Sequence, residues 1–159
     1  MANNPTMRGR DMINAKYGTV LFEIEGKRYV AFNIINFKAT VSNDIKALPV
    51  LDRHLSVHME TGGEGKFEGE AYGAQPYFRQ LLKEKKETLK STYFTIQVDE
   101  HDPGYEGGKS TTIYTDCLID EMTLSLLDSD NTERREPCSG TFDDFMDAQQ
   151  YSVLQAHMR

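Results

Sequence analysis

Alternating apolar and polar residues predict β-strands over most of this chain. The segment Thr19–Ile24 is rich in β-branched and aromatic residues, and the glycine-containing triplet at 25–27 predicts a turn after it. The run Arg28–Thr40 predicts one long strand, apolar on both faces in its first half and alternating in its second half. A strand that is apolar on both faces lies either in a covered sheet or against another subunit. Both alternatives remain open.

The stretch between residues 43 and 65 has no sustained pattern. It contains Pro49 and a glycine-rich cluster at 62–65, and only Leu55–Met59 alternates enough to predict a short strand. Unstructured connections longer than about 15 residues are uncommon in compact domains and are usually functional or mobile. The sequence therefore predicts an extended loop over residues 43–64.

Regular alternation returns at Lys66–Tyr72, with Lys66, Glu68 and Glu70 on one face. A helix is predicted over Pro76–Leu89, because proline suits the first turn and apolar residues recur near i, i+4 spacing. This helix is expected to lay one apolar stripe, which includes Leu89, on a sheet.

Three further strands are predicted after this helix, at Thr92–Asp99, Thr111–Leu127 and Pro137–Phe145. In the middle one, apolar residues change from odd to even positions at Asp120-Glu121, which predicts a bulge or bend. The residues beyond Met146 are weakly helical at best.

Composition sets limits on the fold and the compartment. A chain of 159 residues is the size of one domain, expected to carry an N-terminal arm (1–14) and a C-terminal tail (147–159). The hydrophobic fraction of 38% is modest, so burial against partner chains is a reasonable second source of stability. The chain has no run of 18 apolar residues and no secretory apolar segment near its start, which predicts cytoplasmic synthesis without membrane binding.

Charge and cysteine content argue against several classes of protein. The net charge of −7 disfavours a nucleic-acid binder, since phosphates reward clusters of lysine and arginine. The densest basic run, at 83–86, is interleaved with glutamates and is typical of a solvated helix face. Two cysteines are too few for a disulfide framework and too far apart for a zinc knuckle, so we expect small, half-buried residues on strands.

Four groups of residues invite a chemical interpretation, and none of them predicts an enzyme, a metal or a cofactor. The segment GYEGGKS at Gly104–Ser110 resembles a phosphate-binding loop, but Pro103 replaces its first glycine and strand formers follow it. His54 and His58 fall on a predicted strand, too far apart to share a zinc ion. The carboxylate pairs at 99–100, 120–121 and 143–144 fall at strand ends or bends, and no serine or cysteine has an activating context.

The order of the segments resembles the tail tube proteins of contractile phage tails and of related R-type bacteriocin particles. The resemblance covers Glu64–Asp147 and includes GKFEGEAY, the predicted helix and TYFTIQVDEHD, then TTIYTDCLIDEMTLSLLD and EPCSGTFDDFMD. Three details carry it: the strand opened by Tyr93-Phe94, the long strand with its charged kink at Asp120-Glu121, and the closing run Phe142–Phe145.

This resemblance implies a mainly β fold, a β-sandwich or half-barrel with one flanking helix at about 76–89, and a structural role without catalysis. It implies hexameric rings whose inner strands join into a β-barrel around a lumen, stacked head to tail into a conduit for DNA or for membrane puncture. Ring closure also removes the open sheet edges of each subunit. A long loop between early strands reaches the adjacent ring in this family, and residues 43–64 correspond to it.

The implied conduit suggests roles for individual residues. An acidic wall would repel passing phosphate, and six copies at −7 carry −42 per ring. Candidates for the lumen are the polar faces of the expected inner strands, at Glu68, Glu70, Thr123, Ser125, Thr141 and Asp143. Candidates for contacts between subunits or rings are Tyr29, Val30, Phe32, Ile34, Ile35, Asn43, Leu48, Leu51, His54 and Glu64.

The resemblance also implies partners and a location. The expected partners are further copies of the chain, a sheath protein, a tape-measure protein, and baseplate and tail-terminator proteins, with DNA only as passing cargo. The expected location is a virion tail or phage-tail-like particle assembled in the host cytoplasm. Two alternatives stay open, the tube protein of a type VI-like secretion system and a small-molecule-binding β-barrel.

Overall fold

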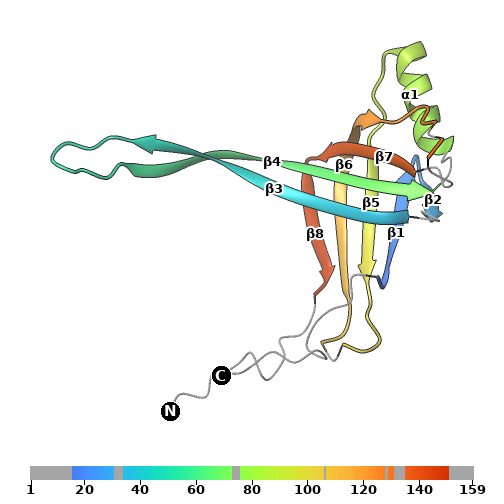
Figure 1. Cartoon of the computed structure of the whole chain (residues 1–159), viewed down its shortest axis with the longest axis horizontal. Helices are drawn as coiled ribbons and strands as arrows, with labels where there is room; N and C mark the ends of the chain where they lie inside the picture. Colours follow the sequence, from blue (N-terminus) through green and yellow to red (C-terminus); the bar gives the residue numbers. More distant parts are fainter. Residues whose placement is uncertain are drawn as a thin grey trace. The chain divides into compact units, whose positions relative to one another are not determined.

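The computed structural model describes residues 16–30, 34–72, 76–105, 107–127, 129–130 and 135–150. Within them the chain is mainly β, with eight strands, one helix and antiparallel pairing between the strands (Figure 1). The elements are β1 (Gly18–Ile24), β2 (Lys27–Val30), β3 (Ile34–Leu48), β4 (Val57–Tyr72), α1 (Pro76–Thr88), β5 (Phe94–Glu100), β6 (Ser110–Met122), β7 (Arg135–Phe142) and β8 (Asp144–Gln149). They fall into two compact units.

The first unit contains β1, β2, β5, the start of β6 and most of β8. Its β1–β2 hairpin closes at the paired residues Ile24 and Lys27, which leaves a two-residue turn. Both turn residues, Glu25 and Gly26, have positive φ angles, of 51° and 81°. This is the turn that best matches the right-handed twist of paired strands. The predicted strand and turn are therefore confirmed.

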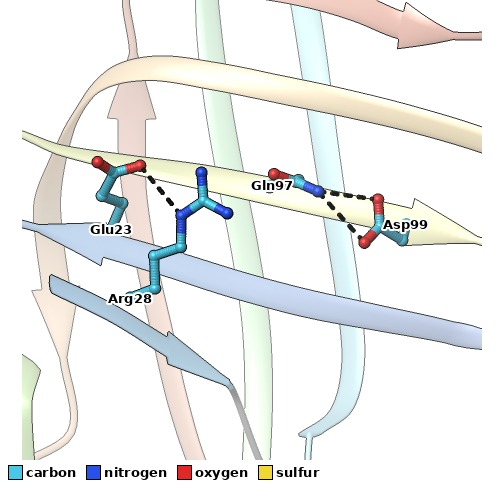
Figure 2. A network of polar contacts seen from close by, with 4 residues as sticks. All are labelled: Glu23, Arg28, Gln97 and Asp99. Atoms are coloured by element: carbon cyan, nitrogen blue, oxygen red, sulfur yellow. Dashed lines mark hydrogen bonds and ion pairs between the residues drawn. The ribbon is translucent and has the colours of Figure 1, made fainter. Parts of the chain in front are cut away.

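The sheet of the first unit has one apolar and one polar face. The core side chains Val20, Phe22 and Ile24 of β1 are buried together with Phe94 and Ile96 of β5, and the register places Phe94 opposite Ile24 and Ile96 opposite Phe22. On the other side of this first sheet, Arg28 lies 3.8 Å from the Glu23 carboxylate (Figure 2). There the Asp99 carboxylate accepts hydrogen bonds from Gln97, at 3.1 Å, and from the Thr111 hydroxyl, at 2.8 Å.

The second unit contains β3, β4, β7, the end of β6 and α1. Its strands pair in the order β3–β4–β7–β6. The registers line up one row of residues across all four strands, namely Ala39, Phe67, Gly140 and Ile119, and a neighbouring row of Lys38, Glu68, Ser139 and Glu121. Successive rows face opposite sides of a sheet. The predicted bulge is confirmed, because the register shifts between Ile119 and Glu121.

The prediction of one strand over Arg28–Thr40 was wrong. Strand β2 ends at Val30 and pairs with β1, whereas β3 begins at Ile34 and pairs with β4, in the other unit. The predicted strand therefore covers parts of two strands with different pairing partners, which periodicity alone does not separate from one strand.

The predicted loop at 43–64 is instead the outer part of a β-hairpin. Pairing between β3 and β4 continues to Leu48 and Val57, and only residues 49–56 form the tip. Because β7 pairs with β4 only from Gly65 onwards, the two strands run on as a ribbon beyond it (Figure 1). Both faces of this ribbon are exposed, so no apolar alternation is required and the sequence gives no strand signal.

Strand β8 also departs from the prediction, which was weak helix beyond Met146. It continues to Gln149, pairs with β6, and is exposed at every position. Backbone pairing holds it without any apolar pattern. Strand β6 ends at Met122 rather than at Leu127, and Leu124, Leu126 and Leu127 are exposed.

The helix is confirmed to within one residue at its C-terminal end. Phe78 is buried and Leu81 and Leu82 are half-buried, as the stripe predicts. Leu89 does not join this stripe, because the helix stops at Thr88 and Leu89 takes a left-handed φ of 59° with its side chain 87% exposed. Within the described residues, α1 is neither long nor apolar enough to cross a membrane.

Candidate assembly surfaces

One side of the second unit's sheet is lined by polar residues from all four strands. We call it the polar face. The registers place on it Asn36, Lys38, Thr40 and Ser42 of β3, Glu64, Lys66, Glu68 and Glu70 of β4, Arg135, Pro137, Ser139 and Thr141 of β7, and Leu118 and Glu121 of β6. Four carboxylates against two lysines and one arginine give these residues a net charge of −1. Leu118 and Pro137 are the apolar exceptions.

The polar face is hollowed at the end where β6 finishes. Here a depression of about 370 Å³ is lined by Glu68, Glu70 and Glu121, with Thr123, Ser139 and Asn36 beside them. The amide of Asn36 donates to the Glu70 carboxylate at 3.4 Å. Carboxylates and hydroxyls that stay in contact with water make this a hydrated acidic surface. Its lining is mostly polar, whereas the lining of small-molecule sites is usually mostly apolar.

Both lysines of the polar face lie beside a glutamate. The Lys38 ammonium is 4.0 Å from the Glu68 carboxylate directly opposite it, and the Lys66 ammonium is 3.8 Å from Glu64 on the same strand. These side chains are all between 57% and 68% exposed. Ion pairs this exposed contribute little to folding stability, so their effect is on the charge that the surface presents.

The opposite face of this sheet is apolar and is packed around glycines. The rings of Phe37 and Phe67 stack with their centroids 6.2 Å apart, across β3 and β4. Phe67 also covers Gly140, and Phe142 covers Gly65. Phe67 and Phe142 are buried.

The outer part of the β3–β4 hairpin, residues 42–64, forms an arm. Its tip carries Leu51, which is 94% exposed, and Leu55, which is 68% exposed. Val41 and Ile45 are exposed along β3 as well. The Thr61 hydroxyl donates to the Asp44 carbonyl at 3.2 Å, where the register shifts by one residue. An extended ribbon with apolar groups in water is suited to docking on another chain.

Helix α1 presents a basic stripe on an acidic protein. Arg79, Lys83 and Lys86 recur at i, i+4 and i+7 and are all exposed. Within the described part of the chain, none of the three takes part in an ion pair. The Arg79 guanidinium donates to the Leu124 carbonyl at 3.0 Å, which holds Leu124 beside the first turn of the helix.

The two cysteines lie in the second unit's sheet. Cys117 is fully buried and Cys138 is half-buried. Burial raises the pKa of the Cys138 thiol to about 11, because removing water penalises the thiolate. Cys138 therefore stays protonated at neutral pH and behaves as a packing residue.

The loop that resembles a phosphate-binding loop leads into a strand, as predicted. Strand β5 ends at Glu100, and β6 begins at Ser110. The Asp102 carboxylate accepts a hydrogen bond from the Gly104 backbone N–H at 2.9 Å, which forms a tight turn. A phosphate site of this type requires a helix N-terminus after the glycines, and a strand supplies none.

Comparison with known proteins identifies the family. The model of the family described as "Phage tail tube protein" matches residues 5–147. The chain belongs to this phage tail tube protein family. Its role is therefore structural, as a phage tail tube protein, which the order of the segments predicted.

Individual relatives of this tail tube protein are distant in sequence. It is 24% identical over 141 residues to "Phage-like element PBSX protein XkdM" of Bacillus subtilis, covering 87% of this chain and 92% of that protein. Its fold matches a chain of the extended PVC sheath-tube complex, an extracellular contractile injection system, with a TM-score of 0.64 at 10% identity. That match covers 88% of this chain and 92% of the other. The PVC sheath/tube terminator structure matches at 0.66 and 8% identity, covering 87% and 97%.

The structure brings some of the predicted lumen residues together. Glu68, Glu70 and Thr123 line the same depression, and Thr141 pairs with Lys66 on the same face. Ser125 lies beyond the end of β6, and Asp143 occupies the bend between β7 and β8. Neither is among the residues that line the depression.

The predicted contact residues fall into two groups. Tyr29 is half-buried on β2, and Ile34 and Ile35 are half-buried at the start of β3. Phe32 lies outside the described residues, as does the side chain of Val30. The second group belongs to the arm: Asn43, Leu48, Leu51, His54 and Glu64.

Sequence reasoning missed several residues of the polar face, among them Lys38, Glu121 and Ser139. Glu121 was assigned to a solvated bend, but the register shift between Ile119 and Glu121 places it opposite Ser139. Continuing the alternation of β7 outward from Thr141 would have found Ser139.

Proposed function

We propose that this tail tube protein forms the inner tube of a contractile tail by assembling into hexameric rings that stack head to tail. The observation that carries the proposal is the division of the second unit's sheet into a polar and an apolar face. A sheet with one hydrated acidic face suits the wall of a conduit, since that face must stay in water after assembly. No catalytic step is needed for this role.

Ring closure would use the open edge of β3. In the strand order β2-β1-β5-β6-β7-β4-β3, the described part of β3 pairs with β4 alone, whereas β6 lies between β5 and β7. Strand edges offer unpaired backbone groups to another chain. Pairing the open edge of β3 with a strand of the neighbouring subunit would continue the sheet around the ring, with the polar face inward. Six repeats of this contact would close a barrel.

Stacking of rings would use the arm. Exposed Leu51 and Leu55 at its tip would be buried against the next ring. The burial of such side chains is favourable by about 1.5–3 kcal/mol each. Repeated six times per ring, this contact would hold the stack without large interfaces in any one place.

The remaining partners would contact the outside and the ends of the tube. The basic stripe of α1 would face the sheath protein, and baseplate and terminator proteins would contact the end rings. A tape-measure protein would occupy the lumen during assembly, and DNA would pass through it later. Net negative charge on the wall would keep phosphates from adhering.

Negative-stain electron microscopy of the concentrated purified protein tests this proposal. Rings with a central channel, stacked into tubes, are expected. Seeding with baseplates from the same particle is the second arm, because nucleation limits many assemblies. A protein that stays monomeric in both arms would overturn the proposal.

A further inference from the structure

The two lysines of the polar face stand out, because a wall that repels phosphate has no obvious use for cations. Lys38 and Lys66 lie on adjacent strands, and both point to the same side as Glu68 and Glu70. Left alone, each would offer an ammonium group to any polyanion in the lumen. In a tube these groups would recur in every subunit of every ring, so even weak attraction would add up along the cargo.

The structure pairs each lysine with its own carboxylate. Glu68 lies across the ladder from Lys38, and Glu64 lies two residues before Lys66 on the same strand. The separations of 4.0 and 3.8 Å are short compared with the Debye length of about 8 Å at physiological salt. A phosphate approaching from the lumen therefore meets a neutral pair rather than a cation.

The other two carboxylates of the face are different. Within the described residues, neither Glu70 nor Glu121 takes part in an ion pair, and both line the depression. Their two negative charges exceed the one positive charge of Arg135 on this face, so the face stays net negative. The four glutamates thus divide into two that neutralise lysines and two that do not.

We propose that Glu64 and Glu68 mask Lys66 and Lys38, so that a phosphate polyanion slides through the lumen without being held. This inference rests on the proposed function, in that it takes the polar face as the lumen wall. It assigns the release of cargo to two particular residues rather than to net charge alone.

A pair of matched double variants separates masking from net charge. Glu64→Gln with Glu68→Gln uncovers the lysines, whereas Glu70→Gln with Glu121→Gln removes the same two charges without uncovering any. Tubes of each are checked by electron microscopy and then sedimented with a fluorescent single-stranded oligonucleotide at 50 mM salt. We expect the first variant to retain at least tenfold more oligonucleotide than wild type, and the second less than twofold more.

Two additions complete the test. Adding Lys38→Gln and Lys66→Gln to the first variant should return retention to the wild-type level, and 0.5 M salt should abolish it. Equal retention by the two double variants, or no retention by either, would overturn the inference.

If wild type forms no tubes, the proposed function fails by itself. Fluorescence anisotropy of the same oligonucleotide with the soluble subunits then tests masking by itself. Masking predicts that the Glu64→Gln, Glu68→Gln variant binds the oligonucleotide more tightly than wild type and more tightly than the Glu70→Gln, Glu121→Gln variant.

Discussion

Gly140 lies directly opposite Phe67 in the β4–β7 ladder, and the aromatic ring occupies the space that a side chain at position 140 would need. A Cβ atom there would fall on the Leu118 carbonyl oxygen and 2.6 Å from the Phe67 ring. The same arrangement recurs two rows away, on the same face, where a Cβ at Gly65 would be 2.5 Å from the Phe142 ring. The absence of a side chain at Gly140 and Gly65 thus leaves the space that these rings occupy.

Gly140→Ala should be strongly destabilising, because the obstructing carbonyl belongs to the backbone and cannot move aside. We expect a loss of about 3 kcal/mol in the free energy of unfolding, measured by urea titration. Gly65→Ala should cost about 1–2 kcal/mol, since a ring can shift. Gly62→Ala is the matched control, with nothing within 4 Å of the added atom. Equal stability of the 140 and 62 variants would contradict this packing.

Removing the arm should block stacking without unfolding the subunit. Ser42 and Glu64 are directly opposite each other, so an Asn-Gly turn can replace residues 43–63 and close a shorter hairpin. The deleted residues are almost all exposed, so circular dichroism should show a folded protein with a melting temperature within a few degrees of wild type. Electron microscopy should show single rings or monomers. Long tubes from this variant would refute the role of the arm.

Reversing charge on the α1 stripe should weaken binding of the sheath protein. Lys83→Glu with Lys86→Glu should reduce co-sedimentation of purified sheath protein with tubes by at least tenfold at low salt. Arg79 is left unchanged because it also holds the Leu124 carbonyl. Lys27→Glu with Lys109→Glu changes the net charge equally at exposed positions of the first unit. An equal loss in this control would assign the effect to net charge.

Cys138 should be slow to alkylate in the folded protein. With a pKa raised from 9.0 to about 11, its thiolate fraction at pH 8 falls about 100-fold. In a Cys117→Ala variant, iodoacetamide labelling should be correspondingly slower than after denaturation, and should accelerate towards pH 11.

The same shift affects stability at high pH. The folded state holds the Cys138 proton more tightly than the unfolded state, so this contribution is complete below pH 9 and is lost as pH rises towards 11. Urea titrations at pH 8 and pH 10.5 should show a larger decrease in wild type than in Cys138→Ala. A decrease of the same size in both would contradict the burial of the thiol.

Asp116 should tolerate glycine and reject valine. Its φ of 52° lies in the left-handed region, in the middle of β6. Asp116→Gly should leave the unfolding free energy unchanged or raise it slightly, whereas Asp116→Val should lower it by about 1–2 kcal/mol. Thr115→Val is the control, because that position has no positive φ. Thermal denaturation would detect the difference.

The fold class and most of the elements could be predicted from sequence, and so could one face of the sheet. Alternation at Lys66–Tyr72 assigned Glu68 and Glu70 to the polar face, because one side of that strand is buried. The helix followed from its apolar spacing, and the β1–β2 turn from Glu25-Gly26. These features depend on neighbours within a few residues, where local preferences and burial agree.

Tertiary structure alone decided the rest. The ribbon at 42–64 and strand β8 have no buried face, so nothing in their sequence records the pairing that makes them strands. The break between β2 and β3 is set by different partners, which lie far away in sequence. The pairing of Lys38 with Glu68 likewise depends on the register between two strands. Register is fixed by backbone hydrogen bonds and by packing such as Phe67 on Gly140, and neither is visible in the order of residues along one strand.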